Sequence, residues 1–168
     1  AEYRPFGWLS SANEGAAALL GIKSSKPVFI KTPAAGVDES KLIRKAKLSL
    51  NAEGDLSGKV AYEYTGHRGI SMKHVYDGRS SDEQLEYFLN ELKEIMPRGE
   101  ITNFTLENRR SWDKNLTITF DLFVPAFAES LGSRLFLDTS IFEAGKSPVF
   151  SKETREQDIM FFYNSTVE

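Results

Sequence analysis

The sequence predicts an α+β fold, predominantly antiparallel β, with one amphipathic helix packed on a sheet face. Residues 41–51 and 116–124 alternate apolar and polar side chains, as half-buried strands do. Residues 82–96 instead repeat apolar side chains at spacings of three and four, as an amphipathic helix does. These patterns leave open whether the strands form one sheet or a two-sheet sandwich.

The size and composition fit one folded domain. The chain has 168 residues, of which 40% are hydrophobic and 27% are charged, unlike the composition of disordered chains. Residues 1–15 hold Pro5, Gly7 and Gly15 around aromatic side chains, which is typical of an irregular segment. We therefore expect residues 1–15 to be a connector from a missing upstream domain and residues 16–168 to be a single β-rich domain.

The first half of the chain contains several candidate strands. Ala16–Ile22 and Val28–Ile30 are short apolar runs, and each fits a buried strand. From residue 42 to residue 50 one parity is apolar and the other is polar, which predicts a half-buried strand. The turn at residues 52–55, where Gly54 can adopt positive φ, then joins this strand to a second one over residues 56–64. The pair is predicted to be a β-hairpin.

The middle of the chain holds one ambiguous segment and one clear helix. Residues 66–78 fit both structures, because residues 70–76 alternate like a strand while Met72, Val75 and Tyr76 share a helical face. Residues 80–84 then offer two overlapping capping boxes, and Pro97 ends the helix that follows. The apolar stripe of this helix must pack on a sheet or a second helix, and it comprises Leu85, Phe88, Leu89, Leu92, Ile95 and Met96.

The second half of the chain predicts four more strands. Strict alternation makes Leu116–Val124 the clearest, and the loop 108–115 separates it from the preceding strand. The other three are predicted at Ile101–Glu107, Arg134–Asp138 and Ile159–Tyr163.

Charge and composition exclude several partner classes. The net charge is -3, so no basic surplus is present to neutralise a phosphate backbone, and we expect no nucleic-acid partner. The apolar runs are all shorter than the roughly 18 residues that cross a bilayer, so we expect no membrane insertion. Cysteine is absent, which removes disulfides, thiolate metal sites and cysteine nucleophiles.

The sequence offers no catalytic, cofactor-binding or metal-binding residue. Its two histidines, His67 and His74, are seven residues apart, which is not the spacing of a zinc pair on a helix. Nucleophile elbows, glycine-rich phosphate loops and calcium loops are all missing. A carboxylate pair such as Glu63 and Asp121 would suit a glycosidase only in a cleft, and both lie on polar strand parities. We therefore expect the chain itself not to be an enzyme and to need no cofactor.

A candidate interface or ligand platform comes from aromatic and basic residues in predicted loops. Phe6 and Trp8 lie in the connector, and Arg109, Arg110 and Trp112 lie in the loop 108–115. Exposed aromatic rings are typical of carbohydrate-binding, peptide-binding and domain-docking surfaces. The alternative without a binding role is that Trp8 caps an edge of the core and that the arginines are solvated.

Features along most of the chain resemble a known domain family. They are the segment Arg4-Pro5-Phe6-Gly7-Trp8-Leu9, the run 15–20, Thr32-Pro33, the hairpin 48–58 and a late segment from Phe150 to Arg155. Together they resemble the uncharacterised C-terminal β-rich domain that follows a transglutaminase-like core in exported proteins of the Bacteroidetes. The resemblance implies a periplasmic or cell-surface location and an upstream papain-like core in the same parent chain.

The resemblance implies a non-catalytic role for this chain. In that family the Cys-His-Asp triad belongs to the upstream core, and this sequence has no cysteine to carry a triad. Our leading hypothesis is an accessory domain that packs on a transglutaminase-like enzyme, a peptidase or amidase, and shapes substrate access. The alternative is an autonomous module that binds glycan or peptide through Trp112, Trp8 and neighbouring tyrosines.

Overall fold

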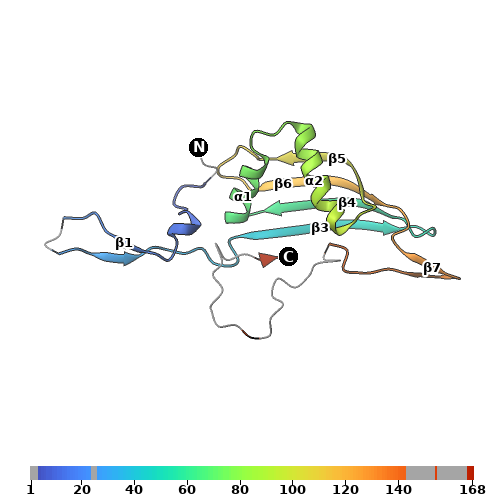
Figure 1. Cartoon of the computed structure of the whole chain (residues 1–168), viewed down its shortest axis with the longest axis horizontal. Coiled ribbons are helices and arrows are strands. Elements are labelled where there is room, and N and C mark those ends of the chain that lie inside the picture. Colours follow the sequence, from blue (N-terminus) through green and yellow to red (C-terminus); the bar gives the residue numbers. More distant parts are fainter. Residues whose placement is uncertain (1–3, 24–25, 143–153, 155–165) are drawn as a thin grey trace.

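The computed structural model describes residues 4–23, 26–142, 154 and 166–168. Within these residues, one five-stranded sheet carries two helices on one face, and two small hairpins extend from it (Figure 1). The α+β class is confirmed. The described strands form a single main sheet instead of a sandwich, and a second helix joins the one that the sequence predicts.

The main sheet has the strand order β5-β6-β4-β3-β9. Neighbouring strands are antiparallel except β9, which pairs in parallel with the start of β3. Both helices lie between β4 and β5 in the chain. Through them the chain crosses one face of the sheet, from β4 in the middle to β5 at the edge. The strands are β3 (Lys41–Leu50), β4 (Leu56–Tyr64), β5 (Glu100–Glu107), β6 (Leu116–Val124) and β9 (Thr166–Val167).

The core lies between the helices and the inward-facing residues of β4 and β6. On β6 every second residue is buried, which confirms the predicted alternation: Leu116, Ile118, Phe120, Leu122 and Val124. On β4 the buried Tyr62 contacts the rings of Tyr64, Phe88 and Phe120 edge-on, with centroid distances of 5.7 to 6.4 Å. The predicted hairpin of β3 and β4 is also confirmed, with Leu50 opposite Leu56 at the turn.

Helix α2 (Ser81–Ile95) begins at the predicted capping box. The Ser80 side chain accepts a hydrogen bond from the Glu83 backbone N–H at 3.3 Å, and the Glu83 carboxylate accepts one from the Ser80 N–H at 2.7 Å. These bonds satisfy two of the donors that a helix start leaves open. The predicted apolar stripe faces the sheet, with Phe88, Leu92 and the following Met96 buried.

The ambiguous segment is a helix, α1 (Gly66–Tyr76). Four of its five buried residues recur every third position, at His67, Ile70, Lys73 and Tyr76, and two of these four are polar. The fifth is Gly69. That mixture hides the helical period from an analysis of apolar residues alone. The prediction of one helix is therefore corrected to two.

The early strands exist, but the prediction that they are buried is wrong. Among the strands of the described residues, β1 (Ala17–Leu19) pairs only with β2 (Phe29–Lys31), and the resulting hairpin projects from the main sheet (Figure 1). Leu19 and Phe29 face each other across this hairpin and remain 63% and 70% exposed. A short 3-10 helix, η1 (Ser11–Asn13), precedes it.

The last predicted strands have different outcomes. Arg134–Asp138 forms a shorter strand, β8 (Arg134–Phe136), which pairs with β7 (Glu129–Leu131) in an exposed hairpin. The predicted strand Ile159–Tyr163 lies outside the described residues, as does nearly all of the segment from Phe150 to Arg155.

Candidate functional site

The two aromatic residues of the predicted connector have different environments. Phe6 is 98% exposed, whereas Trp8 is partly buried against His67 of α1, with ring centroids 5.1 Å apart in an edge-on arrangement. Trp8 therefore attaches the N-terminal segment to α1, in line with the alternative that it caps an edge of the core. Of these two residues, Phe6 is the one that is almost fully exposed to solvent.

A buried polar contact strengthens the same attachment. His67 Nε2 lies 2.6 Å from Glu14 Oε1, and the side chains are only 5% and 12% exposed. The other Glu14 oxygen accepts a hydrogen bond from the Ala35 N–H at 3.1 Å, so one carboxylate ties both ends of the projecting segment to α1. His67 has a structural role here, and no group of three potential metal ligands comes together within the described part of the chain.

The loop 108–115 is held in place by two cations. Arg109 donates hydrogen bonds to the carbonyls of Tyr76 and Arg79, and the buried Lys73 ammonium donates to the carbonyls of Ser111 and Lys114 at 2.6 and 2.5 Å. Burial lowers the pKa of Lys73, although the nearby Asp113 carboxylate opposes that effect. Arg109 is thus a structural residue of this loop.

The predicted platform residues lie in different surroundings. Trp112 is 58% exposed and Arg110 is also exposed, but no ring contact joins Trp112 to Trp8 within the described residues. Glu63 and Asp121 lie on the sheet face opposite the helices, where Asn115 and Asn103 donate hydrogen bonds to them. A glycan or peptide platform at Trp112 stays a prediction.

A cleft that the sequence analysis missed lies between α2, α1 and the strands β3 and β4. It encloses about 430 Å³, and α2 contributes one wall with Tyr87, Phe88, Glu91, Leu92, Glu94 and Ile95. Phe88 packs against Phe120 of β6 and Phe104 of β5, with centroids 5.0 and 5.4 Å away, so α2 lies toward that half of the sheet. The cleft opens on the other side of Phe88, over β3 and β4.

The β3 wall of the cleft carries an arginine on the inward-facing parity. Arg44 lies over the ring of Tyr62 at 5.4 Å and near that of Phe142 at 5.9 Å, and its Nη1 donates a hydrogen bond to the Phe142 carbonyl. Stacking on aromatic faces is a favourable environment for a guanidinium. Arg44 shares its parity with Leu42, so a cation on an apolar strand face was the signal in the sequence that pointed here.

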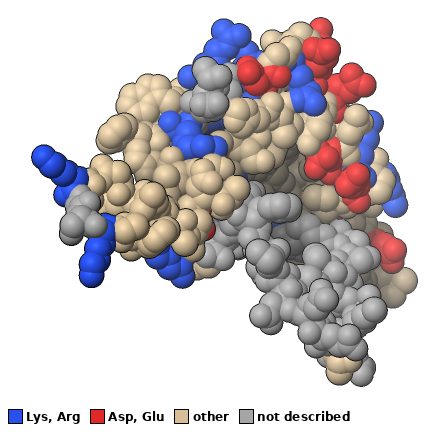
Figure 2. All heavy atoms as spheres, turned by 60° about the vertical axis from the view of Figure 1, so that its left-hand side comes forward, with Lys and Arg blue, Asp and Glu red and all other residues tan. Residues whose placement is uncertain are grey.

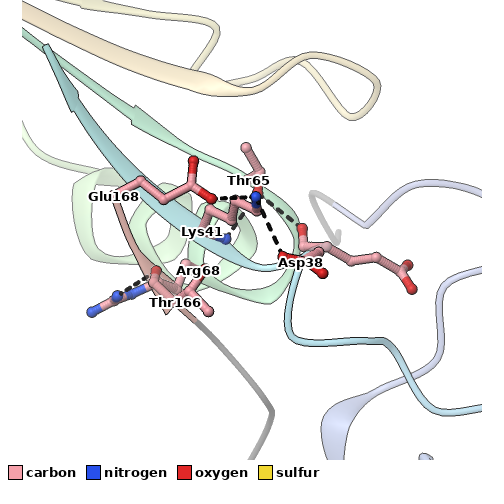
Figure 3. A network of polar contacts seen from close by, with 7 residues as sticks. Asp38, Lys41, Thr65, Arg68, Thr166 and Glu168 are labelled. Atoms are coloured by element: carbon pink, nitrogen blue, oxygen red, sulfur yellow. Dashed lines mark hydrogen bonds and ion pairs between the residues drawn. The ribbon is translucent and has the colours of Figure 1, made fainter.

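A second arginine, Arg68, is positioned by a polar network at the start of α1 (Figure 3). Its Nη1 donates to the Thr166 carbonyl of β9 at 3.3 Å. In the same network the Lys41 ammonium contacts the carboxylates of Asp38 and Glu168, and the Lys41 N–H donates to Thr65 Oγ1 at 2.9 Å. These contacts hold β9, β3 and α1 together and fix the Arg68 end of the cleft.

Two buried tyrosines complete the cleft. Tyr64 is 8% exposed and Tyr76 is fully buried, and the Tyr76 hydroxyl has no hydrogen-bond partner within the described residues. Burial raises the pKa of both hydroxyls well above the usual tyrosine range, and the neighbouring Glu91 carboxylate raises both further. The guanidiniums of Arg44 and Arg68 lie close enough to Tyr64 to oppose that rise in its pKa.

These raised pKa values predict a loss of stability in alkaline solution. Between the ordinary tyrosine pKa of about 10 and the higher folded-state pKa, the unfolded chain loses protons that the folded chain keeps. The free energy of unfolding should therefore be unaffected by these groups below about pH 10 and fall above it, by up to about 1.4 kcal/mol per pH unit for each tyrosine. The free energy of unfolding, measured with urea between about pH 9 and pH 11, should fall less steeply with pH for Tyr76→Phe than for the wild type. An equally steep fall in both proteins would contradict a raised pKa of Tyr76.

Comparisons with known proteins give no identification. No family model, no curated protein and no solved structure matches this chain. The resemblance to a C-terminal domain of transglutaminase-like proteins therefore stays a prediction. None of the described helices is long and apolar enough to cross a membrane.

Proposed function

We propose that this chain is a non-catalytic accessory domain that docks through its N-terminal arm onto a transglutaminase-like core and shapes the access of a peptide substrate. The N-terminal arm comprises residues 4–23 and 26–37, which include η1, β1 and β2. The apolar surface of this arm is the observation that carries the proposal.

The arm exposes many large apolar side chains to solvent. Its exposed large hydrophobics are Phe6, Leu19, Leu20, Ile22, Phe29, Ile30 and Val37. Exposed apolar surface of this kind marks interaction sites in soluble proteins. A two-stranded hairpin is, in addition, only marginally stable on its own. A partner that covers the arm would bury these side chains and stabilise the hairpin together.

Charge on the arm indicates the chemistry of the partner surface. Its described residues contain four basic side chains, Arg4, Lys23, Lys26 and Lys31, and one acidic side chain, Glu14, which contacts His67. Figure 2 shows basic side chains at the tip of the arm, where it comes forward from the rest of the molecule. An apolar surface with an acidic rim would complement this arm, because opposite charges steer and orient association.

Calorimetric titration of this chain with a separately purified transglutaminase-like core tests the proposal. Phe6→Ser should weaken binding at least tenfold, because burying one phenylalanine contributes about 1.5–3 kcal/mol. The same loss is expected for Leu19→Ser combined with Phe29→Ser. Phe123→Ser is the matched control, since Phe123 is 40% exposed on β6, outside the arm, and its loss should leave binding unchanged.

Two outcomes would overturn the proposal. Absence of binding by the folded wild-type chain would remove the docking role, as would binding that the arm variants leave unchanged. Sedimentation of the chain alone distinguishes a further case. A concentration-dependent dimer that Phe29→Ser abolishes would assign the arm to a second copy of this chain and would also contradict docking to a core.

A further inference from the structure

We propose that the cleft between α2 and the sheet binds a free apolar α-amino acid in its zwitterionic form. The cleft's volume of about 430 Å³ lies within the usual range for small-ligand sites, and its walls combine apolar side chains with a few polar groups. This inference goes beyond the proposed docking function, because it uses none of the exposed apolar residues of the arm.

The unpartnered hydroxyl of Tyr76 is the first observation that points to a ligand. Tyr76 lines the cleft and is fully buried, and no group within the described residues accepts from or donates to its hydroxyl. A buried hydroxyl without a partner is unfavourable, and native structures contain few of them. Tyr64 and Glu91 line the same cleft, and both contribute to the raised pKa of Tyr76.

Positive charge in the same cleft defines a carboxylate position. Arg68 and Arg44 line the cleft, and both interact electrostatically with Tyr64. Arg68 makes a single hydrogen bond within the described residues, to the Thr166 carbonyl, so most of its donors remain for a ligand. A guanidinium with free donors is well suited to bind a carboxylate, because charge-assisted hydrogen bonds are the strong ones.

Negative charge on the opposite wall defines an ammonium position. Glu91 and Glu94 lie three residues apart on α2, and both line the cleft with exposed side chains. No ion pair joins either of them to Arg44 or Arg68 within the described residues. Cationic and anionic groups thus face the same space from different elements, and a zwitterion can satisfy both.

The rest of the cleft selects an apolar side chain on the ligand. Met72 of α1, Leu42 of β3 and Ile95 of α2 supply aliphatic contacts, and the rings of Tyr62 and Phe88 supply aromatic ones. Burial of a leucine-sized or phenylalanine-sized side chain against them contributes to affinity through the hydrophobic effect. Amino acids with charged side chains would leave that charge unpaired among apolar walls and should bind weakly.

Calorimetric titration of the full chain with L-leucine and L-phenylalanine tests the inference. At least one of them should bind at low millimolar concentration or below. Leucinamide, which lacks the carboxylate, and N-acetyl-leucine, which lacks the ammonium, should each bind at least tenfold more weakly, because each loses a charge-assisted contact. N-acetyl-leucine binding as tightly as leucine would overturn the inference, since the cleft would then recognise the C-terminal residue of a peptide.

Two variants locate the binding in the cleft. Tyr76→Phe removes only the unpartnered hydroxyl and should leave the thermal midpoint without ligand unchanged or higher, while weakening leucine binding about tenfold. Arg68→Gln should weaken it at least as much, and Arg110→Gln, at an exposed arginine outside the cleft, is the matched control. Absence of binding by the wild type would overturn the inference, as would leucine binding by both cleft variants that is as tight as that of the wild type. Phe6→Ser should bind leucine normally, which separates this test from that of the docking function.

Discussion

Replacing Phe88 by alanine is expected to lower the free energy of unfolding by about 3–5 kcal/mol, as for other large-to-small changes in cores. Phe88 is 4% exposed and is the residue through which α2 meets three strands, by ring contacts with Tyr62, Phe104 and Phe120. Its loss would leave a cavity at that junction and remove dispersion contacts on all sides. Equilibrium unfolding in urea, followed by circular dichroism, measures the change.

The matched control is Phe123→Ala on β6. Phe123 has the same side chain, but it is 40% exposed and lies on the sheet face opposite the helices. Its replacement should lower the free energy of unfolding by less than about 1 kcal/mol, because it removes little buried area. Equal losses for the two variants would show that α2 does not pack on the sheet through Phe88.

The elements predicted correctly are those whose signals are local. Strand β6 alternates strictly over its whole length, and α2 combines a capping box at Ser80 with an uninterrupted apolar stripe. The apolar side of each element needs only one partner surface to cover it, and β6 and α2 cover each other. Pairing of β3 with β4 was equally readable, because the turn containing Gly54 leaves few alternatives.

The errors arise where tertiary contacts decide the outcome. The buried face of α1 includes His67 and Lys73, whose polar atoms are satisfied by Glu14 and by carbonyls of the loop 108–115. Those partners are distant in sequence, so no local pattern shows that the two residues are buried. The burial of β1 was predicted from its apolar side chains, but exposure depends on what covers a strand, and apolar runs also occur on docking surfaces.

The candidate site was predictable only in part. Phe6 and Trp112 are exposed as the loop pattern suggests, whereas Trp8 and Arg109 are used in contacts with α1 and with the residues that follow it. The cleft was not predicted because it requires the relative placement of two helices and two strands. Its one sequence signal, Arg44 on the inward-facing parity of β3, has a meaning only when α1 is recognised as a helix.

Replacing Gly66 by alanine should lower the free energy of unfolding by about 2–5 kcal/mol, the sum of a left-handed backbone cost and an overpacking cost. Gly66 begins α1 with φ of 52°, and a Cβ there would lie 2.3 Å from the Glu39 carbonyl oxygen and 2.6 Å from Ser40 Oγ. Glu39 and Ser40 cannot move aside freely, because they accept hydrogen bonds from the Thr65 hydroxyl and the His67 N–H. Urea unfolding again measures the loss.

Gly132→Ala separates the two contributions. Gly132 has a similar φ of 64°, but no atom lies within 4 Å of the position its Cβ would occupy. This variant should therefore show only the backbone cost, about 1 kcal/mol, and the excess at Gly66 measures the close approach of α1 to the residues before β3. Equal losses at the two glycines would mean that this approach is loose. Arg68, two residues further along α1, would then lack the fixed position on which the proposed carboxylate contact depends.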